Sequence, residues 1–266
     1  MQLLAGFILA IIIALAARKA RSLSRSGMYA AALTGTIIFG IGGWQWAVLL
    51  LTFFISSTAL TRAFKQRKRE ANEKYAKGGE RDAGQVFGNG GVATLFAALH
   101  FFYPEAAWPW LGFAAALAAV NADTWATELG VLNPTPPRLV TDLRRAVEKG
   151  TSGGVSVVGT LASLAGAGLV GLEAALLAPG GVDWAFFALT TVAGLLGSLF
   201  DSFLGATAQA IYYCPACQKE TERHPTHSCG AQTNQVRGWT WLDNDWVNFA
   251  CGAFGAGAAL VFLFFL

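Results

Sequence analysis

The chain has 266 residues, of which 54% are hydrophobic and 13% are charged. A soluble domain carries about 25% charged residues, so this composition excludes an ordinary soluble protein and predicts a polytopic helical membrane protein. The formal net charge of +3 says little by itself. Because no basic region precedes the apolar N-terminal segment, we expect a retained first helix and no cleaved signal peptide.

The expected fold is an all-α bundle of about eight transmembrane helices, each near the ~20 residues that a bilayer requires. The expected spans cover residues 1–17, 28–42, 44–61, 88–104, 108–130, 154–178, 184–213 and 245–266. The second and fourth are the weakest, so seven to nine spans fit the pattern. We expect one membrane domain over residues 1–266.

The basic residues predict an orientation. All 19 Lys and Arg residues fall in alternate loops, which follow the first, third, fifth and seventh expected spans. Because positive loops stay in the cytoplasm, both termini should face outward and the working face should be cytoplasmic. The expected location is a prokaryotic cytoplasmic membrane. The basic cytoplasmic loop, residues 62–87, is either a solvated segment near anionic headgroups or an attractor for a phosphorylated substrate.

Two acids and two hydroxyls end the expected fifth span, in Asn-Ala-Asp-Thr-Trp-Ala-Thr-Glu-Leu-Gly (121–130). An acid within a membrane segment costs at least a few kcal/mol unless it is paired or bound, so it indicates a functional site. On a helix, Asp123 lies over Thr127 and Thr124 lies over Glu128, which gives two polar columns suited to a hydrated cation. The alternative is a helix end whose acids simply reach water.

Two glycine-rich segments enter expected spans from the cytoplasmic side. Residues 84–91 (Gly-Gln-Val-Phe-Gly-Asn-Gly-Gly) and residues 149–156 (Lys-Gly-Thr-Ser-Gly-Gly-Val-Ser) bring backbone N–H donors to a helix start. The second adds a cation and three hydroxyls, a combination that suits phosphate oxygens. Neither is a P-loop, because the chain has no Gly-x4-Gly-Lys-Ser/Thr motif. The alternatives are close helix packing and an ordinary N-cap.

Small and polar residues share one face of the expected seventh span, where Gly194, Gly197, Asp201, Gly205 and Gln209 recur at three- and four-residue steps. The small residues allow close helix approach, so the acid should point into the bundle and require a partner. That partner is a bound cation or, alternatively, an Arg or Lys from a cytoplasmic loop.

The start of the expected eighth span is also polar, with Asp245 and Asn248 on one face and Asp243 placed to act as an N-cap. All of these polar stretches lie at cytoplasmic ends of spans. Carboxylates and amides beside glycine-rich, basic helix starts fit Mg²⁺ together with phosphates.

A CxxC motif precedes the last span, and another Cys and two His residues follow it within about a dozen residues, a spacing typical of a zinc knuckle. Cytosolic placement favours thiolates and a metal over disulfides. We expect a structural Zn²⁺ in the cytoplasmic loop 214–244, held by Cys214, Cys217, His227 and Cys229. His227 is preferred because His-x-Cys keeps the second pair close, with His224 as the alternative.

Four of these stretches, residues 121–130, 150–156, 197–209 and 242–248, form a series. In order and spacing they resemble the integral membrane family of animal transmembrane protein nineteen and the plant phytyl-phosphate kinase, also called domain of unknown function ninety-two. The resemblance implies transfer of a phosphoryl group from a nucleoside triphosphate, CTP or another, to an isoprenoid monophosphate. The product would be the diphosphate, as in salvage of the phytyl chain for tocopherol and quinone synthesis.

For that reaction we expect Mg²⁺ at Asp123, Asp201 and Asp245, with Glu128 completing the catalytic set. Contacts to substrate and phosphate are expected from Asn89, Asn121, Thr124, Thr127, Lys149, Thr151, Ser152, Gly153, Gly154, Ser198, Ser202, Gln209, Asn244 and Asn248. Because the attacking prenyl phosphate is already anionic, positioning and charge neutralisation should supply most of the acceleration.

A transporter or flippase of prenyl phosphates or another anionic lipid is the alternative, because polar groups in spans and a basic face also suit such a carrier. The one-sided polar cluster and the lack of a clear internal repeat argue against it. A lipid transferase with a nucleotide-activated donor is a third option. The expected partners are the lipid bilayer, an isoprenoid monophosphate and a nucleotide, with no nucleic acid. The prenyl chain, the nucleotide and the oligomeric state stay open.

Overall fold

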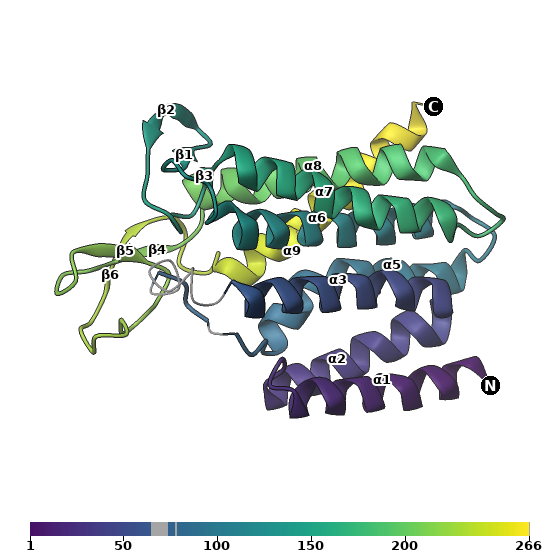
Figure 1. Ribbon diagram of the computed structural model, residues 1–266. Helices are drawn as coiled ribbons and strands as arrows, with labels where there is room; N and C mark the ends of the chain where they lie inside the picture. Colours follow the sequence, from purple (N-terminus) through teal and green to yellow (C-terminus); the bar gives the residue numbers. More distant parts are fainter. Residues whose placement is uncertain (65–73, 78, 266) are drawn as a thin grey trace.

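The computed structural model describes residues 1–64, 74–77 and 79–265, in which long helices form a bundle with two small β-sheets at one end (Figure 1). The described helices are α1 (Gln2–Lys19), α2 (Arg25–Ile37), α3 (Trp44–Ala63), α5 (Ala83–Phe102), α6 (Trp108–Gly130), α7 (Val157–Leu176), α8 (Trp184–Thr207) and α9 (Asn244–Phe264). A π-helical segment, η1 (Ile38–Gly42), continues α2. Each expected span therefore contains a helix, and both termini lie at the end opposite the sheets (Figure 1).

Within the described residues, five helices are long and apolar enough to cross a membrane, namely α1, α3, α7, α8 and α9. The helix α2 has 13 residues, which is too short for a membrane span unless η1 extends it. The helix α6 is different, because its residues 109–122 are buried without a break. It packs against α3, α5, α7, α8 and α9, so its apolar surface on all sides marks the centre of the bundle.

The all-α expectation is wrong in two loops at the polar end. One sheet has the order β2-β1-β3 and consists of β1 (Arg138–Leu139), β2 (Asp142–Ala146) and β3 (Gly154–Val155). The other has the order β5-β4-β6 and consists of β4 (Ile211–Cys214), β5 (Lys219–Thr221) and β6 (Asn234–Arg237). All pairings are antiparallel. The expected spans 154–178 and 184–213 were accordingly too long, because the sheets take up their ends.

Small residues let α8 and α9 approach α6 closely, as the glycine pattern predicted. A Cβ atom added at Gly197 would lie 2.5 Å from the Cβ of Ala119, and one added at Gly255 would lie 2.8 Å from the same atom. A Cβ at Gly194 would lie 2.7 Å from the Cβ of Ala118. Three helices therefore meet around residues 118–119 of α6 with no room for a larger side chain.

Two glycines of α9 test this packing. Gly255→Ala should lower the free energy of unfolding by about 1–3 kcal/mol, because the new methyl group overpacks the contact with α6. Gly257→Ala gives the same chemical change, yet nothing lies within 4 Å of its Cβ, so it should be neutral or slightly stabilising. Thermal unfolding in detergent compares the two variants, and equal melting temperatures would contradict the close approach.

Candidate functional site

A cavity of about 870 Å³ opens at the sheet end of the bundle, among the ends of α3, α5, α6, α7, α8 and α9. Every predicted catalytic and substrate-binding residue lines this cavity except Asn121. Asn121 is buried behind it, where its amide donates to the Gly166 carbonyl at 2.8 Å and its oxygen accepts from Ser56 Oγ at 3.1 Å. It ties α3, α6 and α7 together, so we remove it from the candidate site.

The carboxyl groups of Asp123 and Asp201 both line this cavity and lie close enough for a side-chain hydrogen bond between them. Their position follows from the packing described above. The helices α6 and α8 both run toward the sheets (Figure 1), and they touch at Ala119 and Gly197. One helical turn further on, the residue on each facing surface is an aspartate. Two carboxylates this close cannot both stay ionised without a cation or a shared proton.

Glu128 lies on α6 just beyond this pair and is buried. Its Oε1 accepts a hydrogen bond from Thr61 Oγ1 of α3 at 2.8 Å. Three carboxylates from two helices thus border one cavity, together with the hydroxyls of Thr124, Thr127, Ser198 and Ser202. Carboxylate and hydroxyl oxygens are the hard ligands that Mg²⁺ takes, so these residues fit that ion.

Asp245 has a different environment from the acid pair. Its Oδ2 forms an ion pair with Lys77, whose ammonium also contacts Asp82 at 3.0 Å. Burial works against the charged form of Lys77, but hydrogen bonds to both carboxylates outweigh it and raise the pKa of the ammonium. The expected Mg²⁺ contact at Asp245 would therefore compete with a lysine.

The segment 149–156 lines the same cavity. Gly153 has φ +83°, and a Cβ atom there would lie 2.5 Å from the Cβ of Ala206, so only glycine lets this loop rest on the end of α8. The N–H of Gly154 donates to the Thr151 carbonyl at 2.9 Å, which closes the turn and leaves Gly154 a poorer phosphate donor than expected. Ser156 is the N-cap of α7, accepting from the Gly159 N–H, as the alternative interpretation predicted.

Two predicted phosphate ligands in this segment have protein partners. The Lys149 ammonium donates to the carbonyl oxygens of Val131 and Asn133, at 2.9 and 2.7 Å, just past the end of α6. The Thr151 hydroxyl accepts from the Lys74 ammonium at 3.3 Å. Lys149 thus holds the loop against α6 while it lines the cavity.

The glycine-rich start of α5 serves helix packing. A Cβ atom at Gly88 would lie 2.6 Å from the Asp245 carbonyl oxygen, so glycine lets α5 approach the first turn of α9. Asp82 caps α5 and forms a capping box with Gln85. Asn89 and Asn248, from these two helices, both line the cavity.

Several cavity residues escaped the sequence reasoning, and Arg81 is one of them. Its guanidinium donates to Ser57 Oγ at 2.8 Å and lies over the rings of Phe53 and Phe54, at 5.5 and 5.4 Å from their centroids. Burial lowers its pKa to about 10, against the opposing effect of Glu128, so it stays protonated at neutral pH. In sequence it is one basic residue among many in the loop 62–87. Residues 65–73 and 78 of that loop lie outside the described part of the chain.

Glu222 and Tyr75 were also missed. Glu222 accepts hydrogen bonds from Ser152 Oγ and Gln209 Nε2, each at 3.0 Å, and burial raises the pKa of its carboxyl despite these bonds. Burial also raises the pKa of Tyr75, with Glu222, Glu128 and Asp123 adding to the effect. No sequence motif includes either residue, since the fold alone brings their loops to the cavity.

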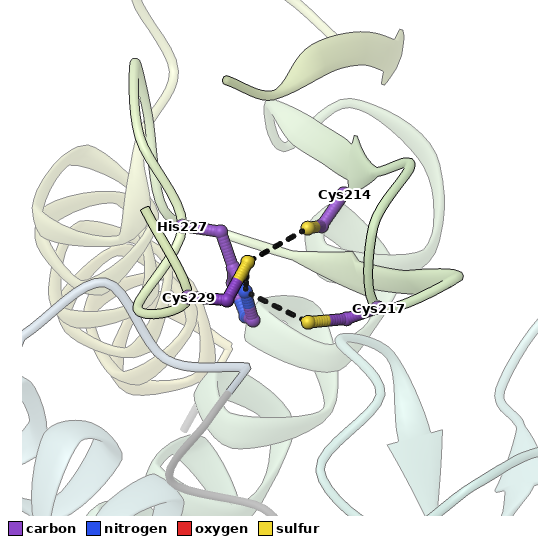
Figure 2. A group of neighbouring side chains, drawn as sticks. All are labelled: Cys214, Cys217, His227 and Cys229. Atoms are coloured by element: carbon purple, nitrogen blue, oxygen red, sulfur yellow. Dashed lines mark hydrogen bonds between the residues drawn. The ribbon is translucent and has the colours of Figure 1, made fainter. Parts of the chain in front are cut away.

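Figure 2 shows the Cys/His cluster, whose four ligand atoms all lie within 4.8 Å of one another. The Sγ atoms of Cys214 and Cys229 are 3.5 Å apart, and Nδ1 of His227 lies 3.5 Å from Cys217 Sγ and 3.3 Å from Cys229 Sγ. Tetrahedral zinc with these ligands requires separations of roughly 3.5–3.8 Å, so the four residues fit the ion. His224 instead stacks on Tyr212, with ring centroids 4.4 Å apart.

Comparison with known proteins gives consistent matches. The family model described as integral membrane protein DUF92 matches residues 8–256. Protein PGR of Arabidopsis thaliana is 34% identical over 270 residues, covering 93% of this chain and 91% of that protein. The uncharacterized membrane protein MJ0933 of Methanocaldococcus jannaschii is 33% identical, covering 77% and 82%. Protein VTE6, chloroplastic, of Arabidopsis thaliana is 26% identical, covering 90% and 65%. No solved structure matches the chain.

The acid pair predicts binding of a divalent cation. Purified protein in detergent should bind Mn²⁺, used as a paramagnetic substitute for Mg²⁺, and Asp201→Asn should weaken this binding by about tenfold or more, or ~1.4 kcal/mol. Asp183→Asn is the control, because Asp183 caps α8 at the opposite end and asparagine also caps helices. Electron paramagnetic resonance measures free Mn²⁺, and equal affinity in both variants would argue against a metal at the pair.

Proposed function

The chain belongs to the integral membrane protein family DUF92, and on this premise we propose that it is a membrane-embedded prenyl-phosphate kinase. It would transfer a phosphoryl group from a nucleoside triphosphate to an isoprenoid monophosphate and release the diphosphate. The reaction comes from the resemblance of its motifs to the family's plant phytyl-phosphate kinase. The observation that carries the proposal is the close pair Asp123 and Asp201 in a polar cavity at the end of an apolar bundle.

In this proposal, each wall of the cavity has a role. Asp123 and Asp201, with Glu128 nearby, would hold Mg²⁺, which neutralises nucleotide phosphates during phosphoryl transfer. The hydroxyls of Thr151 and Ser152, which line the same cavity, would orient phosphate oxygens. Arg81, protonated at neutral pH, would attract the phosphate of the lipid. The acceptor oxygen is already anionic, so positioning rather than a general base would supply the acceleration.

We further propose eight spans with both termini outside and the sheet end in the cytoplasm. The described helices alternate in direction, and the two termini share the end opposite the sheets (Figure 1). Arg138, Arg144 and Arg145 lie in or next to the strands of one sheet, and Lys219 and Arg237 lie in the other. Basic residues at that end support a cytoplasmic position under the positive-inside rule.

An apolar groove beside the cavity supports a lipid substrate. The groove has a volume of about 110 Å³ and lies among α1, α2, α3 and α5. Its walls carry apolar side chains from these helices, such as Leu9, Ile13, Leu50 and Phe53. It shares Arg81, Gln85 and Asn89 with the polar cavity. A prenyl chain in the groove would therefore place its phosphate beside Arg81, at the cavity wall.

A direct assay tests the kinase. Protein in nanodiscs, supplied with geranylgeranyl monophosphate, Mg²⁺ and each nucleoside triphosphate in turn, should yield the diphosphate, detected by mass spectrometry. Asp123→Asn should reduce the rate by about 100-fold or more, ~2.7 kcal/mol in the barrier, because it removes half of the acid pair. Asp183→Asn should keep the wild-type rate. If no nucleotide gives product but prenyl phosphate moves between leaflets in an Asp123-dependent way, the protein is a transporter.

The groove predicts a dependence on chain length. Ala31 lines the groove on α2, so Ala31→Phe should fill it and raise KM for geranylgeranyl monophosphate by about tenfold, ~1.4 kcal/mol, relative to isopentenyl monophosphate. Leu33→Phe adds a ring to the same helix at a side chain that is 55% exposed, so it should leave both KM values unchanged. An equal effect of Ala31→Phe on both substrates would place the chain elsewhere.

A further inference from the structure

The Cys/His cluster closes a segment that has little apolar core of its own. Between residues 211 and 237, the buried apolar side chains besides Cys214 are Ile211 and Tyr212. Strands of three and four residues with so little burial do not hold together in water by themselves. Metal ligation supplies folding energy in such cases.

In the sequence, Glu222 lies midway between two of these ligands, Cys217 and His227. Its side chain and backbone contact three other segments of the cavity wall. Its carboxylate accepts from Ser152 Oγ and Gln209 Nε2, as described above, and from the Ala76 N–H at 3.4 Å. Its own N–H donates to the Lys74 carbonyl at 2.8 Å, next to a 3.1 Å bond from Thr221 Oγ1 to the same oxygen. One glutamate thus joins the Cys/His loop to segments 74–76 and 149–156 and to the end of α8.

We propose that Cys214, Cys217, His227 and Cys229 bind one Zn²⁺ ion, and that this ion fixes Glu222 as a positioning residue of the cavity. The metal closes the chain between Cys217 and His227, so the glutamate in between has a defined place. Glu222 in turn holds Ser152 and the loop around it in place. Loss of the metal would leave the helix bundle intact and release the loop 149–156. The inference rests on the proposed function only where that loop is taken to bind phosphate.

Metal content tests the first half of the inference. Protein prepared without added metal should contain about one zinc per chain by elemental mass spectrometry, and cobalt substitution should give the absorption bands of tetrahedral thiolate coordination. Cys217→Ala should lose the zinc. Cys251→Ala should retain it, because Cys251 lies in α9 outside the cluster. A zinc-free wild-type protein, or a disulfide between Cys214 and Cys229, would overturn the proposal.

Hydrogen exchange tests the second half without reference to any reaction. Chelation of the metal and Glu222→Ala should both speed amide exchange in residues 149–154, with exchange in α6 unchanged. Glu222→Gln should restore part of the protection, because the amide oxygen still accepts from Ser152. Glu220→Ala is the matched control, since Glu220 is exposed on the same hairpin. Unchanged exchange after chelation, in protein shown to contain zinc, would overturn the positioning role whether or not the protein is a kinase.

Discussion

The contact between α6 and α8 determines most of what the polar end of this molecule can do. Gly197 lets the backbone of α8 come against Ala119, and one turn later the same geometry brings Asp123 and Asp201 together. Like charges at that distance repel, so the pair requires either a bound cation or a shared proton. The packing thus creates a position where a bound cation would neutralise the pair, which is why we regard the pair as the centre of the candidate site.

Most of the positive charges at the cavity reach it from loops, although Arg62 lies in the last turn of α3, whereas the acids come mainly from helices. Lys77 pairs with Asp245 and Asp82 from the segment between α3 and α5, and Arg81 reaches the hydroxyl of Ser57 from the same segment. Buried charges persist where they are paired and hydrogen-bonded. A loop at the membrane boundary supplies lysine and arginine without placing them in a span, where they would be costly. Because the loops supply these charges, the charge balance of the site depends on whether the loops are held in a fixed conformation.

The helices could be predicted because apolar runs and alternating basic loops are local properties of the sequence. The acid pair could be anticipated for a similar reason, since Asp201 follows Gly197 by one turn. Asn121 lies outside the cavity. A polar residue in a span serves packing as readily as binding, and sequence does not tell which of its neighbours will accept its hydrogen bonds. Glu222 and Tyr75 were out of reach, because they lie in loops that only the tertiary fold brings to the cavity.

In the proposed kinase, the cavity would take the phosphate of an anionic lipid and the apolar groove would take its hydrocarbon chain. The groove lies among α1, α2, α3 and α5, and the acid pair comes from α6 and α8, so the two regions use different helices. They meet at Arg81, Gln85 and Asn89.

Arg81 suits this boundary because its guanidinium bonds hydroxyls on one side while its plane lies over Phe53 and Phe54 on the other. An arginine can keep its charge there. A flat, weakly hydrated guanidinium stacks well on aromatic faces, whereas the compact ammonium of a lysine does so less well and would lose the contact with the rings. In the proposed complex, Arg81 would therefore mark the boundary between the lipid chain and its phosphate, because this side chain tolerates both environments.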